Sequence, residues 1–282
     1  MHWKPDGPLD VVEPAHLRDA RGFSPSLRRY APPPALAEAV RRFWVPVWSL
    51  PPGERSVQRV LQYPVCQVVV GPGGAQLVGP HAGLSTEELS GSGWVVGVMM
   101  QPAAGLALAG GPVADLTDRR RDLATVPGLD ASGLVAAVVA ALGDDPAEID
   151  RQRQACALVA EALGVLPPVD DEGRLVNAVV EYVEGDREVQ RVAQVCAKFD
   201  LGERTLQRLT RRRIGLSPKW LVQRRRLHDA ADLLRTGTTV DLARVAAELG
   251  YADQAHFTRD FRSATGLTPG EFSAEPGPGC PQ

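Results

Sequence analysis

The pattern of hydrophobic and polar positions in the first part of the chain is that of short strands. Between Val57 and Gln101, runs of Val, Leu, Tyr and Met are separated by glycine and proline turns such as Pro72-Gly73-Gly74. Runs of this kind predict strands over 57–70, 75–79 and 94–101. A short helix is predicted over 35–43, within a segment rich in proline and arginine. We therefore expect a β-rich domain over 1–128, built as a small sandwich or barrel.

Helical spacing begins after this region, with predicted helices over 131–142 and 146–163. In the second helix, Ile149, Cys156 and Leu163 lie seven residues apart, and Val159 falls between them. Two heptads permit two interpretations. The stripe either pairs two copies of the chain, giving a homodimer through 146–164, or packs against its own domain. We assign 129–165 to this helical, candidate dimerisation segment.

The segment 166–172 contains Pro167-Pro168 and predicts a flexible linker. From 173 to 282 the apolar residues recur at helical spacing. Helices are expected over 175–185, 189–199, 203–213, 218–235, 240–249 and 254–264. Tight turns at 200–202 and 250–252 divide two pairs of short helices, as in helix-turn-helix motifs. The predicted fold class is α+β, with a β-rich domain followed by helices and an all-α C-terminal domain.

The second helix of each pair has few apolar anchors and a polar outer face. In 203–213, Leu206 and Leu209 are expected to face inward, while arginines and Gln207 cover the other side. Arginine matches the O6 and N7 atoms of guanine, and glutamine matches N6 and N7 of adenine. The helices about 203–213 and 254–264 are therefore predicted to read DNA.

The distribution of charge supports a nucleic-acid partner although the whole chain does not. The net charge is −3, but nine basic residues and one acidic residue fall between Glu203 and Arg226. A phosphate backbone responds to such a local cluster because salt screens distant charges. The alternative, a solvated basic helix face, has the same composition.

A longer stretch of sequence resembles a known family. Residues Gly250–Phe272 (GYADQAHFTRDFRSATGLTPGEF) are similar to the signature of the arabinose-regulator (AraC-type) family, and 204–209 and 215–220 resemble its first motif. The resemblance implies two recognition helices placed in successive major grooves. Thr210 stands where the family usually has an aromatic residue, and Asp200 where it often has glycine. These departures predict a first motif that is looser or repacked around Phe199, and base reading that depends more on the second motif.

By motif position, the resemblance assigns DNA-contacting residues. The expected base contacts are Arg204, Thr205, Gln207, Arg208, Gln254, Ala255, His256 and Arg259. The expected phosphate contacts are Arg211, Arg212, Lys219, Thr258 and Arg262.

The N-terminal half resembles the cupin-like sensor domain of some AraC-type proteins, through the residues between Tyr30 and Trp44 and through Gly79-Pro80. Some of those domains bind a small effector. Aromatic side chains commonly line apolar pockets. The candidate effector-pocket residues are Trp44, Trp48, Tyr63, Trp94 and Met100.

Common catalytic motifs are absent from the sequence, including G-x-S-x-G, the P-loop and H-E-x-x-H. The four cysteines and five histidines are scattered, so we predict no metal site, no cofactor and no enzyme activity. The alternative is a DNA-repair alkyltransferase-type enzyme fused to an AraC-type domain. That chemistry needs a reactive cysteine in a Cys-rich site, whereas Cys66 stands alone between Val65 and Gln67. The main prediction is a cytoplasmic transcriptional regulator that binds double-stranded DNA and does not enter membranes. A small effector and RNA polymerase are its further candidate partners.

Overall fold

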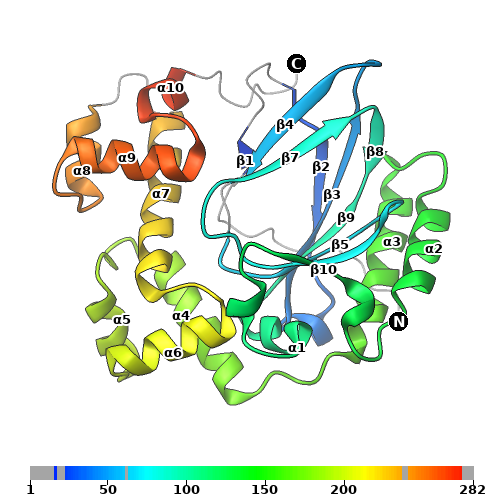
Figure 1. The fold of residues 1–282 in the computed structure, drawn as a ribbon, viewed down its shortest axis with the longest axis horizontal. Coiled ribbons are helices and arrows are strands. Elements are labelled where there is room, and N and C mark those ends of the chain that lie inside the picture. The colour runs from blue at the N-terminus through cyan, green and yellow to red at the C-terminus, as the bar shows by residue number, and fades with distance from the viewer. Residues whose placement is uncertain (1–15, 18–22, 61–62, 237–240, 275–282) are drawn as a thin grey trace.

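The protein consists of a β-rich part and a helical part that lie side by side. The computed structural model describes residues 16–17, 23–60, 63–236 and 241–274. In Figure 1 the strands and helices α1–α3 occupy one side, and α4–α10 occupy the other. Among the described residues, no helix is long and apolar enough to cross a bilayer.

The β-rich part contains two antiparallel sheets. A three-stranded sheet has the order β1-β4-β7, and a seven-stranded sheet has the order β10-β6-β5-β9-β3-β2, with β8 also paired to β3. The strands are β1 (His16–Leu17), β2 (Ser26–Tyr30), β3 (Val40–Ser49), β4 (Arg55–Val60), β5 (Gln67–Gly71), β6 (Gly74–Val78), β7 (Ser85–Ser90), β8 (Ser92–Trp94), β9 (Val96–Met100) and β10 (Arg120–Asp122).

Helices follow the strands for the rest of the chain. The α-helices are α1 (Gly105–Ala109), α2 (Ala131–Leu142), α3 (Ile149–Ala162), α4 (Asp171–Gly185), α5 (Val192–Phe199), α6 (Glu203–Arg213), α7 (Pro218–Thr236), α8 (Leu242–Glu248), α9 (Gln254–Thr265) and α10 (Pro269–Ala274). The short 3₁₀ turns are η1 (Pro34–Leu36), η2 (Pro102–Ala104), η3 (Val113–Leu116), η4 (Leu123–Thr125) and η5 (Leu163–Val165).

Strand β3 shows how the sequence gives the large sheet two different faces. After a register shift between Val40 and Arg42, Phe43 and Val45 point into the core. Successive side chains of a strand point to opposite faces. The intervening residues of β3 therefore line the other face of the sheet, where a cavity lies.

The helix predicted over 35–43 is wrong. Only η1 is helical there, and β3 begins at Val40. The run of β-branched and aromatic residues after Val40 alternates between core and cavity, and such residues fit a pleated surface better than a helix. The predicted strand over 57–70 is also two strands, β4 and β5, which belong to different sheets.

The predicted pairing stripe on α3 is wrong as well. Cys156, Val159 and Leu163 have no exposed area and share one core with the large sheet and α2, whereas Ile149 is 41% exposed. Side chains already buried within the chain cannot pair a second copy. The other interpretation, a helix that packs on its own domain, describes α3.

The linker is held in place rather than flexible. Helix α4 begins at Asp171, two residues before the predicted domain start, and Asp170 caps it by accepting from the Gly173 amide at 2.7 Å. Asn177 of α4 bonds to the β-rich part twice, accepting from the Ala103 amide at 2.9 Å and donating to the Glu38 carbonyl at 3.0 Å.

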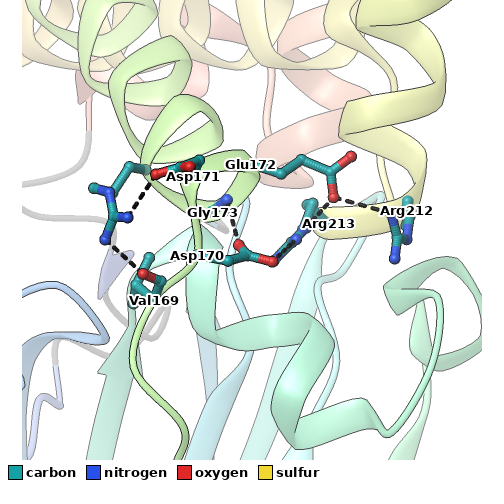
Figure 2. Close-up of polar contacts among 8 residues, drawn as sticks. Val169, Asp170, Asp171, Glu172, Gly173, Arg212 and Arg213 are labelled. Atoms are coloured by element: carbon teal, nitrogen blue, oxygen red, sulfur yellow. Dashed lines mark hydrogen bonds and ion pairs between the residues drawn. The ribbon is translucent and has the colours of Figure 1, made fainter.

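A cluster of ion pairs ties the start of α4 to the end of α6 (Figure 2). Arg213, whose side chain is 5% exposed, donates to Asp170 Oδ2 at 2.5 Å and to Glu172 Oε2 at 2.7 Å. Arg212, 51% exposed, donates to the same Glu172 oxygen at 3.0 Å. The hydrogen bond from Arg213 holds the pKa of Asp170 below its ordinary value of 3.8.

The position of α3 generates a stability prediction. Leu163→Ala should lower the free energy of unfolding by about 2–5 kcal/mol, because it leaves a cavity in a closed core. Ile149→Ala, at the exposed end of the same stripe, should change it by less than about 1 kcal/mol. Urea unfolding at several protein concentrations measures both. Equal losses that also depend on concentration would restore the pairing interpretation.

The lowered pKa of Asp170 generates a pH prediction. A carboxyl whose pKa is lower in the folded state stabilises the fold above its unfolded value, and that contribution is lost as pH falls through the folded value. The difference in unfolding free energy between the wild type and Asp170→Asn should be largest above about pH 5 and shrink as the solution becomes more acidic. Urea unfolding from pH 3 to pH 7 tests this. A difference that stays constant over that range would contradict it.

Candidate nucleic-acid interface

The first helix-turn-helix motif consists of α5, a turn at 200–202, and α6. Asp200 takes the left-handed conformation, with φ +51°, that the tight turn requires, and Gly202 caps α6. Val195, Leu206 and Leu209 bury the inner faces of the two helices. The bounds of α6 are those predicted from the sequence.

Thr210 lies on the inner face of α6. It is fully buried, and its hydroxyl donates to the Gln207 carbonyl at 3.3 Å, which satisfies the polar atom. Phe199 packs edge-on against Tyr182 of α4, with ring centroids 5.8 Å apart. An aromatic pair between α4 and α5 thus supports the motif, in line with the predicted repacking around Phe199.

The outer face of α6 is exposed and polar. Arg204, Thr205, Gln207, Arg208 and Arg211 are all exposed and line one shallow hollow. Gln207 donates to Glu203 Oε1 at 3.1 Å, within the helix. Arg212 continues this face but carries the Glu172 carboxylate on its guanidinium.

The second motif consists of α8, a turn at 249–253, and α9. The Asp253 side chain caps α9 by accepting from the His256 amide at 2.7 Å. Phe257 and Phe261 fill the inner face, with no exposed area. The residues on the outer face are exposed: Gln254, Ala255, His256, Arg259 and Arg262.

Thr258 of the second motif is less accessible than these residues, and the exposed His256 contacts its own domain. Thr258 is half-buried. The His256 ring lies edge-on against Tyr251 at 5.2 Å, and its Nε2 lies 3.5 Å from Asp260 Oδ2. Asp260 is itself held by Gln223 of α7, which donates to it at 2.6 Å. The His256 side chain is therefore positioned by its own domain.

Helix α7 joins the motifs, and two of its arginines are buried. Arg224 and Arg225 are 5% and 6% exposed, and burial lowers the pKa of Arg224 to about 9. Arg225 donates to Asp229 at 2.5 Å and to the Arg187 carbonyl at 2.9 Å. Arg226 lies over the Tyr251 ring at 3.9 Å. The basic run in the sequence is thus only partly exposed, and Lys219 at the start of α7 is one of its exposed members.

The β-rich part contains a cavity of about 760 Å³ between its two sheets. Four of the five predicted pocket residues line it: Trp44, Trp48, Tyr63 and Trp94. Met100 does not, because it lies in the core with no exposed area. Alternation along β9 turns Met99 to the cavity instead.

Polar residues of this cavity escaped the sequence analysis. Arg42, Gln58, Gln67 and Gln76 line it. The period-2 pattern of β3, with Arg42, Trp44, Pro46 and Trp48 on one face, was the signal that could have placed Arg42 there.

Cys66 is poorly suited to act as a nucleophile. It is 2% exposed, and burial raises the pKa of its thiol to about 12, so that the reactive thiolate is scarce near neutral pH. This speaks against the alkyltransferase alternative. Among the described residues, no three His, Cys, Asp or Glu side chains are grouped to hold a metal ion.

Two family models match the chain. Residues 195–275 match the family described as "Helix-turn-helix domain", and residues 28–122 match a "Domain of unknown function (DUF6597)". The second match covers most of the β-rich part, and its description names no function.

Curated relatives match the C-terminal part. The arabinose operon regulatory protein of Escherichia coli is 32% identical over 114 residues, which are 38% of this chain and 36% of that protein. The HTH-type transcriptional regulator MtrA of Neisseria gonorrhoeae is 28% identical over 119 residues, 42% of this chain and 38% of that one. The chain thus spans little more than a third of these relatives.

Solved structures of regulators are also similar. A probable AraC family transcriptional regulator from Rhodopseudomonas palustris is 29% identical over 36% of this chain and 94% of that one, with a TM-score of 0.32. ToxT of Vibrio cholerae is 12% identical over 92% of this chain and 97% of that one, with a TM-score of 0.39.

The matched region holds both motifs, from α5 to α10, with the turns, caps and exposed outer helix faces described above. Residues 195–275 thus match the helix-turn-helix domain family, and this region is similar to the arabinose operon regulatory protein and to other transcriptional regulators.

Proposed function

We propose that this chain is a sequence-specific DNA-binding transcriptional regulator. The observation that carries the proposal is the pair of exposed, polar outer faces on α6 and α9. Each follows a tight turn in a motif of the matched family. Helices of this kind enter major grooves about 34 Å apart along the duplex.

The side chains on these faces suit two different tasks. Arg204, Arg208 and Arg259 carry guanidinium forks that fit guanine, and Gln207 and Gln254 carry amides that fit adenine. Thr205, Ala255 and His256 complete the proposed base contacts. Arg211, Lys219, Thr258 and Arg262 are the proposed phosphate contacts. Arg212, predicted as a fifth, already holds the Glu172 carboxylate on its guanidinium.

An effector role for the β-rich part is the second element of the proposal. The cavity has the size and aromatic lining of a small-molecule site. Tyr63 and Met99 line the cavity and also belong to the apolar cluster that contains Leu227 of α7 and Phe257 of α9. The Tyr63 ring lies 5.2 Å from the His228 ring on α7. An occupant of the cavity would therefore touch residues that support the second motif.

A homodimer through 146–164 would need a surface other than the buried stripe of α3, for example one that includes the exposed Ile149. RNA polymerase as a partner and a cytoplasmic location follow from the proposed role alone.

Selection of bound fragments from a random DNA pool by the full-length protein tests the main proposal. The expected result is one motif spanning two successive major grooves, with half-sites about 10 base pairs apart. Recovery of fragments without any common motif would contradict sequence-specific binding.

Substitutions should divide the interface into base and phosphate contacts. Arg208→Ala and Arg259→Ala should each lose about 1–3 kcal/mol of discrimination at a few adjacent base pairs. The larger loss is expected for Arg259, because Thr210 departs from the family pattern in the first motif. The matched control Arg211→Ala should weaken all sequences alike and flatten the salt slope by about one unit. Competition binding at several salt concentrations measures these effects, and a uniform loss for all three variants would refute the division.

The cavity offers its own optical test, because Trp44, Trp48 and Trp94 are three of the five tryptophans in the chain. A small molecule that enters should quench tryptophan fluorescence and change DNA affinity. Val69→Phe fills cavity space and should abolish both effects. Val57→Phe, at a position of β4 that is 45% exposed, should leave them intact. Pools of cellular small molecules are the first probe. Ligands that quench the wild type but leave DNA affinity unchanged at saturation would contradict an effector role.

A further inference from the structure

One arginine on the outer face of α6 differs from its neighbours. Arg204, Arg208 and Arg212 lie four residues apart, a spacing that places them along one side of the helix. Within the part of the chain that the structure describes, Arg204 and Arg208 form no ion pair, whereas Arg212 is bonded to Glu172. The third member of the row is therefore engaged before DNA arrives.

The engaged carboxylate is fixed from both sides. Glu172 lies in the first turn of α4, where the helix dipole favours a negative charge. Its Oε2 atom accepts from Arg213 Nε at 2.7 Å and from Arg212 Nη1 at 3.0 Å (Figure 2). Because the Arg213 side chain is only 5% exposed, its bond to Glu172 is shielded, while the 51% exposed Arg212 faces solvent.

We propose that the Glu172 carboxylate occupies the position on the Arg212 guanidinium that a DNA phosphate would take. Glu172 thus acts through Arg212, as a positioning residue, and lowers the affinity for DNA. The inference rests on the proposed DNA-binding function. A carboxylate and a phosphate both accept from the same guanidinium donors, so they compete for Arg212. Arg213 keeps the Glu172 charge in place when a phosphate approaches, so repulsion persists even after Arg212 has turned away.

The consequence is independent of DNA sequence. Phosphate contacts position a protein on the duplex but carry no base information. Glu172 should therefore weaken binding to every site by the same factor, and Arg212 should add little to the salt dependence while Glu172 holds it.

Removal of the charge at position 172 is the direct test. Glu172→Gln keeps an oxygen that can accept from Arg213 but removes the competing charge. In fluorescence-anisotropy titrations of the full-length chain at about 0.15 M salt, it should bind all DNA duplexes about three- to tenfold more tightly than the wild type. Its salt slope should be steeper by about one unit.

The neighbouring Asp171 provides a matched control. Asp171→Asn makes the same change in net charge one residue away, but Asp171 is 99% exposed and pairs with Arg174 instead, at 2.6 Å. Its DNA affinity should change by less than about twofold, because an exposed charge without a bound arginine of α6 is screened by salt. Equal gains in both variants would overturn the proposal, since net charge alone would then explain them.

A double-mutant cycle separates competition from a structural role. Arg212→Ala should cost less than about twofold in the wild type, but about three- to tenfold in the Glu172→Gln background, where the guanidinium is available to a phosphate. An equal cost in both backgrounds, or weaker binding by Glu172→Gln, would overturn the proposal.

A second comparison leaves Glu172 unchanged. It serves if circular dichroism shows that the Glu172→Gln variant is unfolded. Arg211→Ala should flatten the salt slope of the wild type by about one unit, and Arg212→Ala should leave it nearly unchanged. Equal flattening would overturn the proposal. If the wild type binds DNA selectively but the variants do not differ in affinity or salt slope as described, this inference alone is overturned. If neither the wild type nor any variant binds DNA, the proposed function is overturned as well.

Discussion

The buried guanidinium of Arg213 is the interaction on which the arrangement of the two parts depends. A charge with a side chain only 5% exposed is costly unless acceptors surround it, and Asp170 and Glu172 provide them. The backbone at the same point is held by the β-rich part. Thr117 donates to the Gly215 carbonyl at 3.0 Å, and a side chain at Gly105 would come within 3.0 Å of the Arg213 carbonyl. The end of a recognition helix is therefore also the junction of linker, α4 and β-rich part.

The helical part is also bonded to the β-rich part at the start of α7. Trp220 at the start of α7 donates to the Ala82 carbonyl at 2.7 Å, so this helix is bonded to the β-rich part close to the same junction. Further along α7, Leu227 shares an apolar cluster with Tyr63 and Met99. Each motif is thus held by different residues of the β-rich part. Those that pack in the cluster of the second motif, Tyr63 and Met99, also line the cavity. A ligand bound in the cavity would contact Tyr63 and Met99, which share an apolar cluster with Phe257 of α9.

Short-range sequence patterns predicted the helices of the C-terminal part well. The predictions that failed concern surfaces whose burial depends on strands distant in the sequence. The bounds of α6 followed from short-range patterns, because turns and helix ends are decided by neighbouring residues. The stripe on α3 followed the same rules, but which surface it covers depends on distant strands, so the pairing interpretation failed. Strand β3 was mistaken for a helix because proline and arginine obscured its alternation. In the cavity, aromatic type located Trp44 and Trp48, but only the strand register separates Met99 from Met100.

The contacts of Arg212 and Arg213 in α6 depend on the side of the helix on which each lies, which the amino-acid composition does not give. Consecutive residues of an α-helix point about 100° apart, so Arg212 and Arg213 cannot share a role. Arg213 falls three and four residues beyond Thr210 and Leu209, on the buried face, whereas Arg212 falls on the outer face. A buried arginine requires acceptors, and the acidic run Asp170-Asp171-Glu172 spans the N-cap and the first two residues of α4. Alternate members of that run meet Arg213, while Asp171 between them stays in solvent. The junction therefore follows from two local features: the side of α6 on which Arg213 lies, and the spacing of Asp170 and Glu172. The same spacing brings the Glu172 carboxylate to the neighbouring Arg212.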